Sequence, residues 1–310
     1  MIKNIKCTLI VVLFFVFTFG QFGTARATTG TVNLGSSGIF AILAGSGITN
    51  TGATTIAGDV GSSAIDTQTG FETVTFTSGA NHTTANPNDA TTQGAKVDLA
   101  AAYTDAAGRT SATPIVGGEL GGRTLTPGVY TDNNDPDSLA LTGTLTLDAQ
   151  GSTDAVFIFQ SGSSLTTASG SRVSLINGAQ ACNIFWQVTS SATLGTTTDF
   201  KGTILALTSI TLNTGATVNG RLLAQNGAVT LDANTITAST CATPSAEAAA
   251  AAAAYNAAKA AADAAAAAAA AKLPNTGVAP SQNDTPWNAV ILVGVFAGAI
   301  LIMVRRKQKS

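Results

Sequence analysis

Apolar residues alternate with threonine through most of the segment between residues 139 and 237. In Ile210-Thr211-Leu212-Asn213, an extended strand would direct the isoleucine and leucine to one side and the threonine and asparagine to the other. Residues 192–206 recur as 210–224, and the first half of this repeat returns as Val229-Thr230-Leu231-Asp232. Short repeats with this alternation predict a β-solenoid whose coils stack strand on strand. Stacking would produce an aliphatic inner ladder and an outer ladder rich in threonine.

The N-terminal part of the chain carries related signals. Candidate strands lie at residues 39–43, 48–49 and 74–76. Thr51-Gly52-Ala53-Thr54 is similar to Thr214-Gly215-Ala216-Thr217, and a similar apolar stretch follows each. We therefore expect the N-terminal segment to supply rungs to the same solenoid. Further on, residues 156–160 and 184–188 are expected to be equivalent core strands, with another strand at 173–176 between them.

A helical pattern interrupts the strands at residues 88–108. Asn86 or Asn88 can cap its start, and Gly108 suits its end. Small apolar residues recur at helical spacing along one side, namely Ala95, Leu99, Ala102 and Ala106. Because these side chains are short, the helix can lie close against a flat sheet. We expect it to cover one solenoid face and assign it no chemistry.

Both ends of the chain predict export and attachment rather than fold. Residues 1–27 combine an early basic region, an apolar run and Ala25-Arg26-Ala27, as in a secretory signal peptide. Residues 242–272 are almost pure alanine, which favours a semi-rigid helical stalk, with a collapsed or disordered tract as the alternative.

The C-terminal segment carries the most specific signal in the chain. The pentapeptide Leu273-Pro274-Asn275-Thr276-Gly277 precedes residues 278–310, which hold a polar spacer, an apolar stretch at 287–304 and a basic tail. This order resembles the LPxTG-type sorting signal of Gram-positive bacteria. The resemblance implies that sortase cuts between Thr276 and Gly277 and joins Thr276 to peptidoglycan. The protein would then be anchored in the cell wall and contact the membrane only before sorting.

Composition and charge exclude several classes of function. Only 10% of the 310 residues are charged and the net charge is −2, which argues against nucleic-acid binding. His82 is the only histidine and is expected to be a surface residue, so a catalytic triad or histidine-rich metal site is not available. The acidic run at 132–137 lacks the order of an EF-hand and is expected to be a solvated turn. We expect no cofactor, no metal and no enzymatic activity.

Two cysteines remain once the leader is removed. Outside the cell, Cys182 and Cys241 can form one disulfide that ties the end of the solenoid to its middle, the alternative being two unpaired thiols.

Five segments together resemble the ice-binding-like family, which includes many microbial antifreeze proteins. They are Ala41 to Gly45, Leu125 to Tyr130, Asp154 to Gln160, Asn177 to Asn183 and Asn219 to Ala224. The resemblance covers about Thr31 to Thr237, within a domain that we place at residues 28–241. It implies a right-handed, discontinuous β-solenoid of triangular section with a long helix alongside. Members of this family that bind ice do so through one flat face and have no catalytic residues.

The predicted ice-binding surface is a flat array of threonine hydroxyls and methyls. Its residues are Thr51, Thr54, Thr146, Thr166, Thr193, Thr196, Thr211, Thr214, Thr217 and Thr230. Asp148 and Asp232 are expected on the same face, and Lys201 and Arg221 on the adjacent one. Threonine is also simply a good strand residue, so each position has a structural alternative. The alternative function is a wall-anchored adhesin or structural protein that binds a protein or glycan; a carbohydrate-active enzyme is weaker, because the acidic and basic residues are scattered.

Overall fold

A computed structural model describes residues 30–82, 89–132 and 138–242, together with a few positions between 257 and 265. Those few positions, which fall in the alanine-rich segment, are helical. The predicted signal peptide, the sortase motif and the apolar stretch at 287–304 lie outside the described residues. Within the described ranges, no helix has the length and apolar character needed to cross a membrane.

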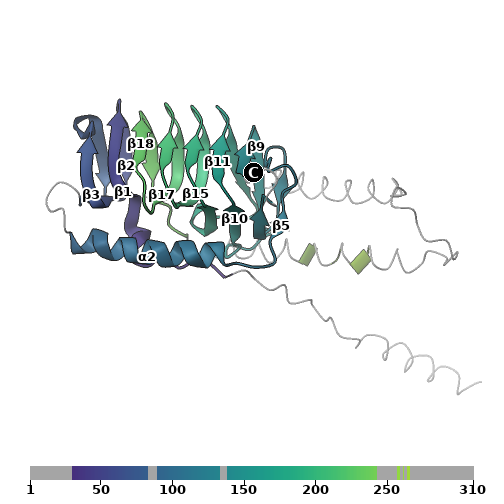
Figure 1. The fold of residues 1–310 in the computed structure, drawn as a ribbon. Helices are drawn as coiled ribbons and strands as arrows, with labels where there is room; N and C mark the ends of the chain where they lie inside the picture. The colour runs from purple at the N-terminus through teal and green to yellow at the C-terminus, as the bar shows by residue number, and fades with distance from the viewer. Residues whose placement is uncertain are drawn as a thin grey trace, which may run out of the picture.

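The strands form three parallel ladders around a common core, with one long helix alongside (Figure 1). We name the first ladder the helix face, because the helix packs on it. Its strands follow in the order β5 (Thr113–Pro114), β7 (Gly128–Thr131), β10 (Phe157–Ser161), β13 (Ile184–Val188), the second halves of β15 (Asp199–Ala206) and β17 (Thr217–Ala224), the first half of β1 (Phe40–Thr51), and β3 (Asp59–Thr69).

The other two ladders complete each coil. The threonine face consists of β8 (Ser138–Leu141), β11 (Ser164–Thr167), β14 (Ala192–Leu194), β16 (Ile210–Leu212), β18 (Val229–Asp232), the second half of β1 and the end of β3. The charged face consists of β6 (Thr124–Leu125), β9 (Thr144–Asp148), β12 (Arg172–Ile176), the first halves of β15 and β17, β19 (Thr235–Thr237), β2 (Thr54–Ala57) and β4 (Val74–Ser78).

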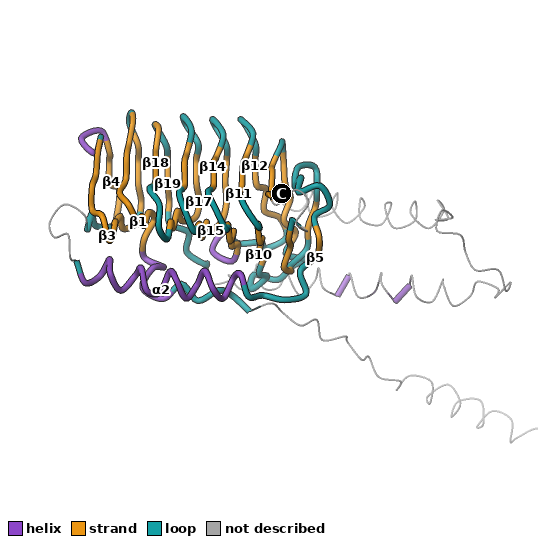
Figure 2. Tube along the Cα trace, in the orientation of Figure 1, coloured by secondary structure: helices purple, strands orange, loops and turns teal. Residues whose placement is uncertain are grey.

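The order of the coils in space differs from their order in the chain. β1 pairs with β17 and β18, so the N-terminal coils stack beyond the C-terminal ones. The helix then takes the chain back along the solenoid to the opposite end, where β5 begins the remaining coils (Figures 1 and 2). The prediction that the N-terminal segment supplies rungs to the same solenoid is therefore confirmed. The right-handed sense of the coil stays a prediction.

The helix α2 (Ala90–Ala107) begins close to the predicted position. Its N-cap is Asp89, whose carboxylate accepts a hydrogen bond from the Thr92 amide at 2.8 Å, and not the predicted Asn86 or Asn88. Gly108 is the C-cap, and all four residues of the predicted apolar stripe are buried. A strand side chain also reaches the helix backbone: Gln160 Nε2 donates to the carbonyls of Ala106 and Ala107, which the helix end leaves unsatisfied, and to that of Arg109 just beyond the helix.

Aromatic side chains stack along the interior of the solenoid. The ring of Tyr130 lies 5.5 Å from that of Phe159, Phe159 lies 4.0 Å from Trp186, and Trp186 lies 5.0 Å from Phe200. The stack follows from register, because β10 and β13 pair Phe159 with Trp186. The two predicted core strands are therefore equivalent, although the first spans residues 157–161 and not 156–160. The predicted strand at 173–176 is β12.

In the described ranges, three short 3₁₀ helices each directly precede a strand, namely η1 (Gly35–Ile39), η2 (Phe71–Thr73) and η3 (Ala181–Asn183). Within η3, Cys182 is joined to Cys241 by a disulfide that spans 59 residues of sequence, with the two Cα atoms 5.4 Å apart. Of the two alternatives for these cysteines, the structure contains the paired one.

Candidate functional site

One column of threonines runs along the threonine face in continuous register. Each member pairs with the next across neighbouring strands, in the order Thr166, Thr193, Thr211, Thr230, Thr49 and Thr69. Parallel strands place successive members about 4.8 Å apart. Their side chains point outward because the residues on either side of them point inward: Ile210, Leu212 and Leu231 are buried in the core. We call these six residues the threonine ladder.

The strand segments that carry the ladder are almost free of charge. On one side of it, Ser138 and Ser164 are paired in register, and their hydroxyls lie 2.9 Å apart. On the other side, two residues after each threonine, the chain places small or polar residues such as Ala168, Asn213 and Thr51. Asp232 is the only charged residue in segments 138–141, 164–167, 192–194, 210–212, 229–232 and 48–51. The end of β3, which carries Thr69, adds Asp66.

Asp232 lies at the edge of the threonine face. Its Oδ2 accepts a hydrogen bond from the Thr214 hydroxyl on the turn that follows β16. The carboxylate is therefore engaged at the corner of the coil and not within the ladder. Asp148, which was expected on the same face, lies instead on the charged face at the end of β9, where Oδ1 accepts from the Gln150 amide and from Asn177 Nδ2, each at 2.8 Å.

The ten predicted threonines divide into three groups. Thr166, Thr193, Thr211 and Thr230 belong to the ladder. Thr51, Thr196 and Thr214 are exposed at the edge of the threonine face or on the turns that follow its strands.

The remaining three lie elsewhere, so we exclude them from the candidate surface. Thr146 and Thr217 are on the charged face, where Thr217 pairs with Asp199. Thr54 is 1% exposed, and its hydroxyl accepts a hydrogen bond from the Asn234 amide at 3.1 Å.

The misplacement of Thr54 has a simple cause in strand register. The sequence comparison matched Thr54 with Thr217, whereas the structure pairs Thr217 with Thr235 and Thr235 with Thr55. A slip of one residue moves a side chain to the opposite side of a strand. Thr54 therefore points into the solenoid, and Thr55 points out of it on the charged face.

Two ladder residues, Thr49 and Thr69, were not among the predicted site residues. Both are exposed and extend the ladder over the N-terminal coils. The sequence did contain a signal for Thr49, because Ile48-Thr49-Asn50-Thr51 repeats the alternation of Val229-Thr230-Leu231-Asp232, and these segments pair residue by residue. Thr69 follows only from the pairing of β3 with β1.

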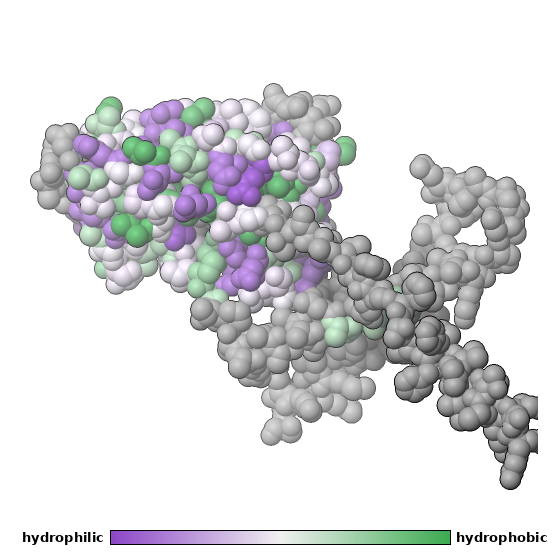
Figure 3. All heavy atoms as spheres, turned by 90° about the horizontal axis from the view of Figure 1, so that it is seen from below, coloured by the Kyte–Doolittle hydropathy of each residue, from purple (hydrophilic) through white to green (hydrophobic). Residues whose placement is uncertain are grey.

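The other two faces are less suitable for a flat, uncharged array. On the charged face, the carboxylate of Asp199 is paired with Lys201 Nζ and lies 3.7 Å from Arg172 Nε. The helix face is covered by α2, and where its side of the molecule is visible, hydrophobic and hydrophilic residues are interspersed (Figure 3). Arg221 was expected on the same face as Lys201; it lies on the helix face and is 7% exposed.

Two candidate sites for chemistry have structural contacts instead. His82 is not a free surface residue: Nε2 lies 2.9 Å from Asp59, Nδ1 lies 3.3 Å from Asp89, and the ring lies 5.3 Å from that of Phe40. Asp132 is fully buried, and its Oδ2 accepts from the Gly162 amide at 2.7 Å, so it does not begin a solvated turn. In the part of the chain that the structure describes, no three side chains of the metal-binding types are clustered.

Comparison with known proteins identifies the class to which this fold belongs. Residues 42–237 match the ice-binding-like family, and the chain belongs to it. It is 43% identical over 234 residues to an ice-binding protein from Nostoc sp. (strain HG1), which covers 75% of this chain and 84% of the relative. It is 42% identical to an ice-binding protein from Colwellia sp, with 67% and 84% covered. Membership of this family supports the expectation that the chain is not an enzyme.

Solved structures agree with this assignment. A crystal structure of an ice-binding protein from an Antarctic biological consortium is similar with a TM-score of 0.64 and 46% identity, over 68% of this chain and 93% of that one. A crystal structure of an ice-binding protein from the Antarctic ascomycete Antarctomyces psychrotrophicus is similar with a TM-score of 0.62 and 39% identity. The match covers 68% of this chain and 100% of the chain in that structure.

Proposed function

We propose that this protein adsorbs to ice through its threonine face. The observation that carries the proposal is the in-register ladder of six threonines, five of which lie on segments that together contain one charged residue. A rigid coil fixes the hydroxyls and methyls at a regular spacing, so little ordering entropy is lost when they meet a regular surface. Each hydroxyl contributes on the order of 1 kcal/mol or less. Many acting together can make adsorption nearly irreversible.

The charges of the molecule support the choice of this face. Ionised groups hold their own hydration water, which disfavours the face that carries Arg172, Asp199 and Lys201. The sheet surface of the helix face is not available, because α2 packs on it. The relatives and structural neighbours named ice-binding proteins support ice as the ligand.

A paired substitution tests the choice of face. In Thr211→Tyr, a phenol ring would stand above the ladder, and we expect thermal hysteresis and inhibition of ice recrystallisation to fall several-fold. The matched control is Thr235→Tyr, which places the same ring on an exposed position of the charged face and should leave both activities unchanged. Arg221→Ala is not a suitable control, because Arg221 is buried and bonded.

The same measurements separate ice from other ligands. Equal loss of activity in both tyrosine variants, or loss in Thr235→Tyr alone, would reject the threonine face. A wild-type protein that is inert toward ice but binds glycans or proteins would instead support the adhesin function.

We also propose that the protein is exported and joined to the Gram-positive cell wall through Thr276. The support is the order of sequence features, from a leader at 1–27 to the pentapeptide at 273–277 and the basic C-terminal tail. The stalk at 242–272 would then hold the ice-binding domain away from the peptidoglycan. Thr276→Ala should release the protein from the wall fraction, whereas Asn275→Ala, at the variable position of the motif, should leave it attached. Wall attachment of both variants would contradict the proposal.

A further inference from the structure

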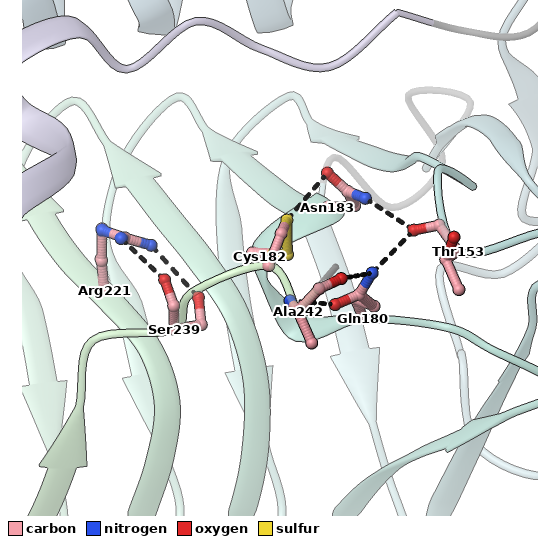
Figure 4. Close-up of a disulfide and its surroundings, with 8 residues drawn as sticks. Thr153, Gln180, Cys182, Asn183, Arg221, Ser239 and Ala242 are labelled. Carbon is pink, nitrogen blue, oxygen red and sulfur yellow. Dashed lines mark hydrogen bonds between the residues drawn. A yellow bond between two sulfur atoms is a disulfide. The ribbon is translucent and has the colours of Figure 1, made fainter. Parts of the chain in front are cut away.

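The last described residues leave the sheet and cross the solenoid. We call residues 238–242 the C-terminal strap. It starts beside β19, where the Ala238 amide donates to the Ala57 carbonyl at 2.8 Å. It ends beside η3, at the start of β13, after passing the rungs of β17 and β15 (Figure 4). The strap thus connects the exit point of the chain to the middle of the domain.

Arg221 fixes the first part of the strap. Its guanidinium is buried and donates to the carbonyl of Ser239 at 2.8 Å and to the Ser239 hydroxyl at 3.1 Å. The same side chain donates to the Gly38 carbonyl at 2.8 Å, so it also holds the N-terminal segment against β17. These contacts close the coil, but every one of them is a hydrogen bond that tension can break.

The end of the strap is fixed covalently as well. Cys241 is bonded to Cys182 in η3. Next to it, the Gln180 side chain forms a two-way contact with the backbone of Ala242, accepting from its amide at 2.7 Å and donating to its carbonyl at 3.2 Å. Gln180 and Asn183 also donate to the Thr153 carbonyl, which ties η3 to the preceding coil.

The position of this attachment decides where tension enters the domain. β19 is only three residues long and pairs with β17 through Thr235, Ile236 and Thr237. A pull on the C-terminus that acted through β19 would break its hydrogen bonds one after another. The disulfide instead conveys the pull directly to Cys182.

We infer that the Cys182–Cys241 disulfide is a mechanical anchor, through which tension arriving from the C-terminal side bypasses residues 183–240. The inference rests on the proposed attachment to the cell wall, because an attached cell held on ice would be pulled from this side. Half of the threonine ladder lies inside the bypassed segment, namely Thr193, Thr211 and Thr230. The disulfide therefore keeps a pull on the C-terminus from peeling away the strands that carry these three threonines.

Force spectroscopy on the full chain, with handles at its two termini, tests the anchor without involving ice. In the oxidised wild type, residues 183–240 should release no length at any force, which leaves the extended chain about 200 Å shorter than without the disulfide. In the double variant Cys182→Ser with Cys241→Ser, an additional event should appear at a force below the main unfolding event of the wild type. A double variant that unfolds in one event at the wild-type force would overturn the inference.

Gln180→Ala separates the covalent bond from the hydrogen bonds beside it. It should not change the rupture forces of the oxidised wild type, but it should lower the force of the additional event in the double variant. If Gln180→Ala lowered the rupture force by the same amount in the oxidised wild type and in the double variant, the hydrogen bonds would carry the load. That result would also overturn the inference. If the double variant fails to fold, thiol reduction of the wild type supplies the same comparison.

Thermal hysteresis of the unloaded variants distinguishes this inference from the proposed function. We expect the double variant to retain the ice activity of the wild type when no force acts. If no variant, including the wild type, acts on ice, the proposed ligand is wrong, whereas the mechanical comparison stands by itself.

Discussion

Thr49 and Thr230 pair in register on adjacent rungs, although one lies near the start of the domain and the other near its end. This pairing joins the N-terminal coils to the C-terminal ones and makes the threonine ladder continuous across the junction. The ladder is therefore a product of the discontinuous chain path: without the return of the chain along α2, Thr49 and Thr69 could not follow Thr230.

Thr49→Tyr should reduce thermal hysteresis about as strongly as Thr211→Tyr, because both rings would interrupt the same ladder. If the N-terminal coils were not part of the ice-binding site, Thr49→Tyr would have little effect on thermal hysteresis. Thr75→Tyr is the control, since Thr75 is exposed on the same N-terminal coils but on the charged face. Hysteresis measured at equal protein concentration, with circular dichroism to verify folding, decides between these outcomes.

The coil and the helix could be predicted from the sequence because both follow from local patterns. Alternation along Ile210-Thr211-Leu212 fixes which side chains face the core, and the spacing of Ala95, Leu99 and Ala102 fixes the buried side of α2. The similarity of neighbouring repeats also placed Thr193, Thr211 and Thr230 in one column. Register inside these repeats needs no information from distant parts of the chain.

The errors arose where a choice depends on distant residues. Glycine-rich turns do not fix register, so Thr54 was matched one residue out and assigned to the surface. Asn86, Asn88 and Asp89 are all good helix caps, and only in the folded chain does Asp89 also meet His82. The contact of His82 with Asp59 is likewise made by coil stacking, which no local pattern reveals.

Trp186→Ala should be strongly destabilising. The indole is 1% exposed, stacks on Phe159 and donates from Nε1 to the Lys201 carbonyl at 3.0 Å. Its removal leaves a large cavity in a stack that cannot collapse, because the strands on both sides fix its width. We expect a loss of about 3–5 kcal/mol in the free energy of unfolding, measured by urea denaturation. Val97→Ala, at a position 71% exposed, should change it by no more than about 0.5 kcal/mol.

Asp89→Ala tests the start of α2. Hydrogen bonding from the Thr92 amide lowers the pKa of Asp89 below 3.8, because the bond favours the charged carboxylate. Its stabilisation is therefore fully present above pH 3.8 and is lost as the pH falls through the lowered pKa. We expect a cost of about 1 kcal/mol at neutral pH, and a difference in melting temperature from the wild type that narrows in acid. Asp105→Ala, which removes an exposed pair with Arg109, should cost less.

The lowered pKa of Lys96 predicts that the stability of the fold changes with pH in alkaline solution. Its Nζ donates to the Ala224 carbonyl at 2.7 Å and to the Gln225 carbonyl, and burial lowers its pKa from 10.5 to about 8. Between these two values the unfolded chain binds more protons than the folded one, so this residue makes stability rise with pH there. We expect the wild type to gain stability relative to Lys96→Met between about pH 8 and about pH 10.5. Other titrating groups cancel in this comparison, whereas the lost hydrogen bonds add an offset that is present at every pH. Melting temperatures of the two proteins measured in parallel across this window provide the test, and a difference that stays constant would show that Lys96 keeps its ordinary pKa under the helix.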